Sequence, residues 1–578
     1  MRLGSIDFPT QLIKAIRSDR LVVFAGTGVS MGEPACLPDF KRLVELIIQK
    51  PVTDDTPLDR ILGIHHHRGV HVHEKAKELL SNTTSQPTLL HHQILRLFPG
   101  PEKVRLITTN YDELFEKATP TLWTSPSKIF EAPALPLGKD FRGIVHVHGA
   151  ISGPLSGMVL TDGDFGRAYL TEGWARRFFL DVFQNFTVLF IGYSHEDLIL
   201  QYIARALPAN QSEKNIWRFA LGEEVSRLKW DLLGINLIPF PTWEGNNFGA
   251  LNEGIQKLSD LVQKGTLEWQ TDISQMSDIP PSIDQEQIDF ILDIFEEGWK
   301  TNLFTKVVRE VSWIEWLDEH QILESLFNPN PLSESGKHLS SWIIVNFLQT
   351  HSDNIFALLG NHSLQLNPEF GILIANHVVS PDSSLSPSDF NRWISYLLKT
   401  FPKSFGQSLL MSMIQKCSDQ SAFESLLQTF ERILENSLHI DQHLVSKGGA
   451  SKSVTYIFEF DHGNLLLVWK NWIQPHINVI APQILCVIVS NLAERFRTRC
   501  QLGLARREGD SDSFARPAIE PHEQNWNFSP VDVVVDCGRE ALDWLQKNDE
   551  ILFKSWVARL LREDAPLLRR LAVYGLRE

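Results

Sequence analysis

The sequence predicts a parallel α/β sheet in its first part, followed by a region built of helices. Short apolar, β-branched runs alternate with amphipathic helical segments up to about residue 265. Such alternation is typical of a parallel sheet with helices on both faces. Beyond residue 286 helical spacing continues with few strand-like alternations, and ten of the sixteen tryptophans lie there. We interpret these tryptophans as packed core of an irregular helical array, since no strict repeat is visible.

The chain length requires several domains. A chain of 578 residues exceeds what one hydrophobic core serves, so roughly two to four domains are expected. We assign residues 1–265 to the α/β domain and 286–578 to the helical region. Between them, the polar segment 266–285 contains Pro280-Pro281 and reads as a linker.

The amino-acid composition limits the cellular compartments and the classes of binding partner that we expect. The net charge of −16 argues against broad nucleic-acid binding, which needs a basic face. The five cysteines are scattered without a C-x-x-C pair, which fits a reducing compartment. Neither a run of about 18 apolar residues nor an apolar leader is visible, so we expect no membrane span and a cytoplasmic location.

The elements of the α/β part follow one another in a regular order. A helix over 9–19 precedes the strand Leu21–Ala25, and a helix over 40–50 and a mostly helical stretch over 52–97 come next. The later expected strands lie at 104–109, 143–149, 187–191, 217–221 and 235–239, and the later helices at 196–206, 223–232 and 248–264.

The first strand ends in a glycine turn. Gly26 and Gly28 lack the Cβ that would keep a phosphate from the backbone, and Ser30 adds a hydroxyl group. The third glycine, Gly32, comes one residue too late for the dinucleotide fingerprint. A turn without any ligand would also explain the two glycines.

Polar residues follow three further strands. Thr109, Asn110 and Asp112 come at the end of the second strand, where open α/β sheets bind ligands, although they could simply cap the next helix. In the third strand His148 stands next to a glycine and could reach a cleft, whereas His146 reads as a core residue. The fourth strand ends in Gly192-Tyr193-Ser194, which suits a ribose hydroxyl or a phosphate.

Histidines are frequent between residues 65 and 92. His67 and His71 have the i, i+4 spacing of metal ligands. No carboxylate signature such as H-E-x-x-H accompanies them, so we interpret the run as a solvated face and expect no metal site.

Taken in order, the motifs A-G-T-G-V-S with L-P-D-F, T-T-N-Y-D, V-H-G and G-Y-S resemble those of the sirtuin (Sir2) family of NAD-consuming enzymes. The resemblance covers roughly residues 8–265. It implies a Sir2-like, Rossmann-like parallel sheet with NAD as substrate. Deacetylase sirtuins hold a zinc ribbon of two C-x-x-C pairs after the H-G histidine, but no cysteine lies between His148 and Ser194. The resemblance therefore implies a zinc-free domain.

Three departures resemble the Sir2-like domains of bacterial anti-phage proteins, which hydrolyse NAD. Thr109 replaces the usual glutamine, Lys41 replaces the arginine of P-D-F-R, and the phrase Leu160–Phe165 stands where a zinc module would be. The resemblance gives catalytic roles to three residues: Asp112 would hold the nicotinamide carboxamide, Asn110 would position the ribose and water, and His148 would be the general base. Because His148 must be neutral to accept a proton, we expect activity to fall at low pH.

The same resemblance implies the NAD-binding residues. They are Ala25, Gly26, Gly28, Ser30, Asp39, Phe40, Thr109, Gly192 and Ser194. The glycines and Ser30 would cradle the pyrophosphate, Asp39 and Phe40 would line the nicotinamide pocket, and Ser194 would meet the adenosine ribose.

We therefore expect an NAD hydrolase of anti-phage defence whose helical region restrains or assembles it, as a homo-oligomer, until a phage protein binds. A zinc-free deacylase or ADP-ribosyltransferase, and a non-catalytic NAD sensor, stay open. Residues 506–530 read as a mobile loop. The amphipathic end at 567–576 predicts either a chain that continues or an end buried against another subunit.

Overall fold

The computed structural model describes residues 1–577 except 54–55, 82–83, 194–215, 243–247, 282–283, 401–405, 446–448, 507–508 and 526–528, with backbone alone for 440–454. The described chain forms two compact units. The first contains Met1–Asp272 and Pro281–Ile294, and the second contains Ile273–Pro280 and Phe295–Glu578.

A seven-stranded parallel sheet forms the centre of the first unit and confirms the predicted fold class. Its strand order is β5-β6-β4-β3-β7-β8-β9, and every neighbouring pair is parallel. Without the edge strand β5, this is the 3-2-1-4-5-6 order of dinucleotide-binding folds, in which the order reverses between β3 and β7. The bounds are β3 (Leu21–Ala25), β4 (Arg105–Thr108), β5 (Ile129–Glu131), β6 (Gly143–His146), β7 (Thr187–Ile191), β8 (Arg218–Gly222) and β9 (Asn236–Pro239).

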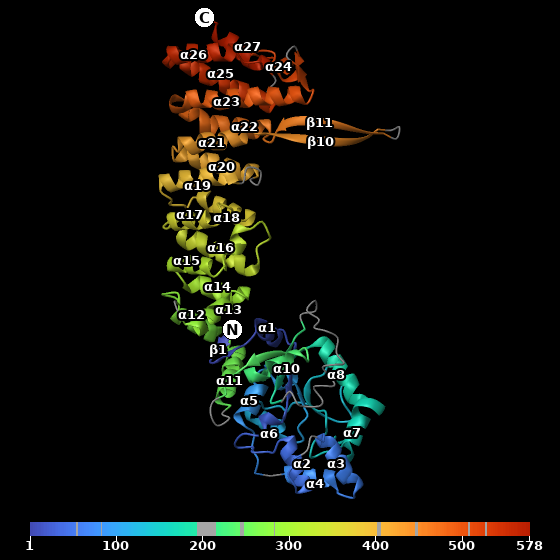
Figure 1. The fold of residues 1–578 in the computed structure, drawn as a ribbon. Coiled ribbons are helices and arrows are strands. Elements are labelled where there is room, and N and C mark those ends of the chain that lie inside the picture. The colour runs from blue at the N-terminus through green and yellow to red at the C-terminus, as the bar shows by residue number, and fades with distance from the viewer. Residues whose placement is uncertain are drawn as a thin grey trace. The chain divides into compact units, whose positions relative to one another are not determined.

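Helices cover this sheet and bury its apolar strands. β3 and β7 are buried along their whole length, as strands covered on both faces must be. Figure 1 shows α2, α3 and α4 gathered at one end of this unit, where they enclose a smaller apolar cluster of their own. The helices are α1 (Thr10–Arg17), α2 (Phe40–Ile48), α3 (Leu58–His67), α4 (Val72–Leu80), α5 (Leu89–Leu95), α6 (Leu114–Leu122), α7 (Asp162–Gly166), α8 (Trp174–Asn185), α10 (Arg227–Asp231), α11 (Gly249–Gln263), α12 (Thr266–Gln275) and α13 (Gln285–Ile294).

Several elements differ from the expectation. The strand expected over 143–149 ends at His146, so His148 lies beyond the ladder. The expected linker contains helix α12, and α13 belongs to the first unit although it follows the linker in sequence. The short pair β1 (Arg2–Leu3) and β2 (Ile6–Asp7) and the edge strand β5 carried no recognisable sequence pattern. The helix expected over 196–206 lies outside the described residues.

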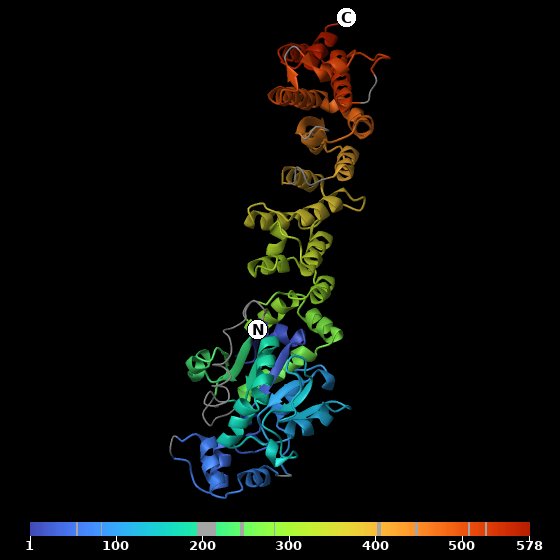
Figure 2. The ribbon, with the colours of Figure 1, turned by 90° about the vertical axis from the view of Figure 1, so that its right-hand side faces the viewer.

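The second unit is a stack of helices, and each helix packs mainly on its near neighbours in the chain. Figures 1 and 2 show this stack from two directions. The helices are α14 (Gly298–Val307), α15 (Ser312–Glu319), α16 (Glu334–Phe347), α17 (Ser352–Asn361), α18 (Pro368–Val379), α19 (Pro387–Thr400), α20 (Gln407–Asp419), α21 (Phe423–Ile433), α22 (His462–Val468), α23 (Ile477–Gln501), α24 (Ser511–Ala515), α25 (Pro530–Asn548), α26 (Glu550–Leu561) and α27 (Pro566–Gly575).

Strands interrupt the helical region in two places. A hairpin of β10 (Asn436–Val445) and β11 (Gly449–Phe458) extends sideways from the stack (Figure 1). A short pair, β12 (Ala505–Arg506) and β13 (Gly509–Asp510), follows α23. The stretch 506–530, expected to be a loop, contains α24 and the buried Arg516, which pairs with Asp532 and Asp536 of α25. The apolar face of α27 packs on α25 and α26 of the same chain.

One helical stretch of the second unit is long and apolar. His462–Gln501 has the length and composition to cross a membrane, with a mean hydropathy of 1.6 in its most apolar window. The sequence analysis recognised no such stretch. Of that window, 44% is buried inside the protein, where α23 packs on α21 and α25. The core helix of a soluble protein has the same composition, so the stretch is weak evidence for a membrane span.

Candidate functional site

The carboxyl ends of three adjacent strands bring the predicted catalytic region together. The strands β6, β4 and β3 lie side by side and point the same way, so the residues after them meet at one edge of the sheet. The Asn110 side chain, after β4, donates to the carbonyl oxygen of Gly26 (3.2 Å) and to Ser30 Oγ (3.3 Å), both after β3. The carbonyl oxygen of Asn110 lies 3.2 Å from His146 Nδ1, at the end of β6.

The glycine turn after β3 packs against the loop after β7. The N–H groups of Gly26 and Gly28 donate to the carbonyl oxygens of Ile191 and Gly192, each at 2.9 Å. A Cβ on Gly26 would lie 2.6 Å from the Gly192 oxygen, and Gly192 itself has a φ of +73°. The glycines are thus required for the close approach of two loops at the switch point. Their own N–H groups are donated in that approach, and the expected contact of this turn with a phosphate stays a prediction.

Ser30 joins three other side chains, those of His91, Asn110 and Asp112, in a buried hydrogen-bond network. The backbone N–H of Thr88 donates to His91 Nδ1 (3.1 Å), and the Thr88 hydroxyl oxygen lies 2.8 Å from the same nitrogen. His91 Nε2 lies 3.3 Å from Ser30 Oγ. Asn110 donates to that oxygen, and the Ser30 hydroxyl donates to Asp112 Oδ2 (3.0 Å). Ser30 therefore links Asn110 to Asp112, and its contact with a phosphate stays a prediction.

Asn110 presents an unused acceptor. Its residue is 4% exposed, and both hydrogens of its side-chain amide are donated within the site. Among the residues that the structure describes, its Oδ1 atom has no hydrogen-bond partner although it is buried. An unpaired buried polar atom costs about 1–3 kcal/mol, so such an atom requires an explanation. A bound donor, such as a water or a ribose hydroxyl, would supply the missing bond.

Burial and one ion pair shift the pKa values of the ionisable groups at the site. Burial raises the pKa of Asp112, against the hydrogen bonds that its carboxylate accepts from Leu114 N and Ser30. Burial alone would lower the pKa of His146, but the hydrogen bond that its Nε2 donates to Glu116, at 2.6 Å, and the charge of that carboxylate raise the pKa to about 9. His146 is therefore the paired core histidine that the sequence analysis expected, and its positive charge lies near Asp112.

His148 is buried beside an aromatic group. It is 2% exposed, and burial lowers the pKa of its imidazole to about 3, so the ring is neutral at physiological pH. Its Nε2 atom lies 3.0 Å from the hydroxyl oxygen of Tyr169. The Val147 N–H, just before it, donates to the Thr108 carbonyl, so the chain after β6 still runs beside the chain after β4.

The remaining predicted binding residues are distributed around the same edge. Thr109 Oγ1 lies 3.0 Å from the Tyr193 hydroxyl oxygen, and Ala25 accepts a hydrogen bond from Thr108. Asp39 caps α2 by accepting from the Arg42 N–H, and Phe40 packs on the cluster around α2, α3 and α4. Among the residues that the structure describes, neither Asp39 nor Phe40 forms a hydrogen bond with the network around Ser30. Ser194 lies outside the described residues.

Two residues of the site escaped the sequence analysis. His91 was included in a run interpreted as a solvated face, which is correct for the exposed His66, His67 and His71 but wrong for the fully buried His91. The Thr88 cap, three residues before it, is the signal that could have placed His91 at a buried helix start. Tyr169 carried no local signal.

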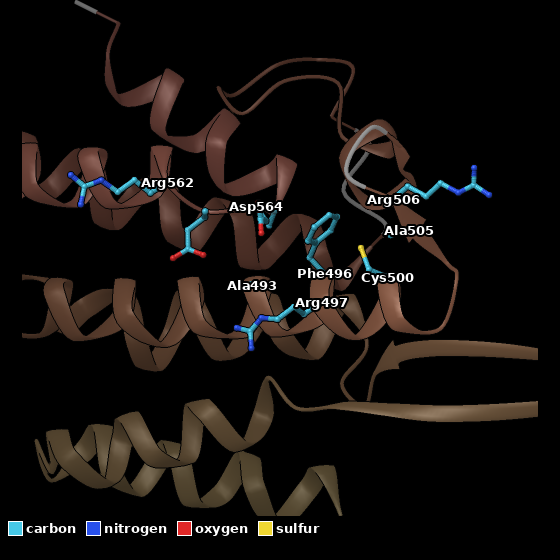
Figure 3. Close-up of a pocket in the computed structure, with 10 residues that line it drawn as sticks. Ala493, Phe496, Arg497, Cys500, Ala505, Arg506, Arg562 and Asp564 are labelled. Atoms are coloured by element: carbon cyan, nitrogen blue, oxygen red, sulfur yellow. The ribbon is translucent and has the colours of Figure 1, made fainter.

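Within the part of the chain that the structure describes, neither a metal-binding cluster nor the cavity found in the second unit coincides with this network. Over the described residues, no group of three or more histidine, cysteine or acidic side chains is arranged to hold a metal ion. A cavity of about 390 Å³ lies in the second unit, beside Phe496, Cys500 and the turn after α26. Figure 3 shows the side chains of its three arginines, Arg497, Arg506 and Arg562, on different sides of the cavity, so they do not converge on one ligand position.

Comparison with known proteins agrees with the fold of the first unit. The chain is 24% identical over 385 residues to the uncharacterized protein y4cA of Sinorhizobium fredii (strain NBRC 101917 / NGR234). That match covers 60% of this chain and 31% of the relative, so the chain spans under a third of the relative's length there. Residues 104–238, which contain the strands β4 to β9 and both Asn110 and His148, match the SIR2-like domain. The first unit thus has a Sir2-like fold, and this match points to NAD-dependent chemistry.

Proposed function

We propose that this protein hydrolyses NAD to nicotinamide and ADP-ribose at the edge formed by β3, β4 and β6. The observation that carries the proposal is the buried, unpaired Oδ1 atom of Asn110, fixed in direction by two donated hydrogen bonds. The SIR2-like match over 104–238 supports NAD as the ligand. A ribose hydroxyl or the attacking water would donate to this oxygen.

Hydrolysis of NAD needs protein groups that stabilise the charge that develops in the transition state. Breaking the bond between nicotinamide and ribose builds positive charge on the ribose, so a positioned acceptor and a nearby carboxylate stabilise the transition state. In this proposal Asn110 orients the ribose and water, Asp112 receives the nicotinamide carboxamide, and neutral His148 accepts the proton. Ser30 and His91 hold Asn110 and Asp112 in place.

The decisive experiment is incubation of the purified full chain with NAD, followed by identification of the products. We expect nicotinamide and ADP-ribose in equal amounts, without a modified protein. Asn110→Ala should lower kcat by at least about a hundredfold, because the acceptor acts in the transition state. Asn185→Ala is the matched control, since that exposed amide only donates to the Asp181 carbonyl and should leave kcat unchanged.

Other products would support another reaction of the same site. An acyl-ADP-ribose or an ADP-ribosylated protein would indicate a zinc-free deacylase or a transferase. NAD binding without turnover in the wild type and in Asn110→Ala would indicate a sensor. Turnover that is equal in the wild type and in Asn110→Ala would contradict the assigned mechanism.

The biological role is part of the same proposal. Loss of NAD harms the cell that carries out the reaction, so we propose a cytoplasmic anti-phage enzyme that the helical unit restrains or assembles into a homo-oligomer. A phage protein that binds the helical unit would release the activity. Survival of cells with and without Asn110→Ala during phage infection tests this role.

A further inference from the structure

Three aromatic rings form a stack beside His148. Phe165 and Tyr169 are nearly parallel, with ring centroids 6.1 Å apart and planes inclined by 16°. Tyr169 is stacked in the same way on the buried Phe179, again at 6.1 Å and with an angle of 18°. The His148 ring stands almost perpendicular to this stack, at 85° to Phe165 and 84° to Tyr169.

The local chain geometry builds this stack. The Thr161 side chain and Asp164 form a capping box that starts α7, and Asp164 also accepts a hydrogen bond from His73 Nε2 (2.8 Å). The helix then continues into a π-helical turn, Arg167–Thr171, which contains Tyr169. Such turns are rare and occur frequently at functional sites. The segment is therefore fixed at its start and packed on the core at its end.

We propose that Tyr169 is a positioning residue that fixes both the orientation and the tautomer of His148 for the reaction, an inference that rests on the proposed function of the site. The 3.0 Å contact between the Tyr169 oxygen and Nε2 engages that nitrogen, which leaves Nδ1 for the substrate. A neutral imidazole can accept a proton at Nδ1 only if its hydrogen is on Nε2. In the reactive form, Nε2–H therefore donates to the Tyr169 oxygen.

The proton balance of hydrolysis agrees with this assignment. The bond between nicotinamide nitrogen and ribose carbon breaks with its electron pair on nitrogen, and a bond between ribose carbon and water oxygen forms. The proton lost by water passes to Nδ1 of His148, whose Nε2–H stays bound to Tyr169. It then leaves to solvent as the one proton that NAD hydrolysis releases.

The test is Tyr169→Phe in the full chain, which keeps the ring stack and removes only the hydroxyl group. We expect kcat to fall by about tenfold, with KM for NAD and the melting temperature within experimental error of the wild type. In a His148→Ala background the same substitution should have no further effect on kcat, because the proposed role is exercised through that imidazole. The matched control is Tyr396→Phe, which removes a hydroxyl group that donates to the Leu364 carbonyl in the second unit. This control should leave kcat, KM and the melting temperature unchanged.

Other results would overturn the assignment. A wild-type kcat in Tyr169→Phe, a rise in KM alone, or an equal loss in the His148→Ala background would each contradict a positioning role. Should the wild type not consume NAD, the proposed function fails, and ¹⁵N chemical shifts of the labelled His148 ring decide the inference independently. A shift of the ring signals between wild type and Tyr169→Phe supports it, and unchanged signals overturn it.

Discussion

His148 differs from an ordinary histidine in its response to pH. The ordinary histidine pKa of 6.5 is lowered by burial to about 3, so the folded protein keeps this ring neutral down to pH values where a free imidazole is already charged. We therefore predict that kcat shows no fall around pH 6.5 and that its acid limb lies below about pH 5. Initial rates of NAD consumption between pH 4.5 and 8 would measure this. A limb centred near 6.5 would contradict the burial of His148 in the reacting complex.

The buried histidines make the free energy of unfolding depend on pH, and His91 and His148 act in the opposite sense to the charged His146. His91 and His148 both have a pKa lowered to about 3, so below pH 6.5 the unfolded chain binds protons that the folded chain does not. Their contribution is present above pH 6.5 and is lost as the pH falls toward 3. The pKa of His146, raised to about 9, gives stability below pH 6.5 that is lost as the pH rises through 9. Rates at low pH must therefore be measured on protein shown to be folded.

The sequence predicted the residues of the site better than it predicted the residues that contact them. Asn110, Asp112, Ser30 and His148 were all selected because polar residues follow buried strands, and the structure gathers the first three in one network. Ser30 also lies 3.3 Å from the buried His91, a partner 61 residues away in the sequence. Contacts between residues so far apart in sequence, like that of His148 with Tyr169, have no local pattern from which they could be predicted.

At the scale of elements, the loop after β7 covers the turn after β3. The hydroxyl groups of Thr109 and Tyr193 meet at 3.0 Å, from strands that lie on opposite sides of β3. A Cβ on Gly26 would lie 3.0 Å from Cδ2 of the Tyr193 ring, so this ring lies over the glycine turn. Dinucleotides bind at this crossing point in open α/β sheets, so we expect a ligand there to displace the ring.

We predict that Thr109→Val strengthens NAD binding. The substitution removes one partly exposed hydrogen bond, worth about 1 kcal/mol, that holds the Tyr193 ring in place. The displaced position of the ring then becomes easier to reach, so KM should fall by about fivefold without a change in kcat. Tyr193→Phe removes the other partner of this bond, so the effects of the two substitutions on the bond should not add in the double variant. Steady-state kinetics measures these values. A higher KM in Thr109→Val would instead show that its hydroxyl contacts the ligand, as the sirtuin resemblance implies.

The elements that sequence reasoning missed share a physical cause. The core helices and six of the seven strands carry apolar patterns that can be recognised. The three residues of β5 are exposed or half-buried, too few for a period, and lie at the sheet edge. The hairpin β10–β11 was not recognised in the sequence. It extends away from the helical stack (Figure 1), so no shared core imposes an apolar pattern on it. Residues 506–530 look polar, but Arg516 is 1% exposed because two aspartates pair with it.

At the scale of the molecule, the boundary between the units changes how regulation must be tested. Helix α13 follows the expected linker but belongs to the first unit. Arg17 of α1 makes two hydrogen bonds to Asp293 of α13, at 2.7 and 2.6 Å, and Lys257 of α11 pairs with Glu286 at 2.8 Å. A truncation at residue 286 would break these contacts and leave Arg17 without its partly buried partner, which destabilises a protein.

We predict that residues 1–294 form a folded protein that consumes NAD faster than the full chain. The cut after Ile294 keeps α13 and removes the helices α14 to α27, which we propose as the restraining part. Thermal unfolding shows whether the shorter chain is folded, and Asp293→Asn in that chain should lower its melting temperature by weakening the pair with Arg17. Rates of NAD consumption are then compared at equal folded concentration. Equal rates would refute restraint by the helical unit, and a folded but inactive 1–294 would show instead that the helices assemble the active form.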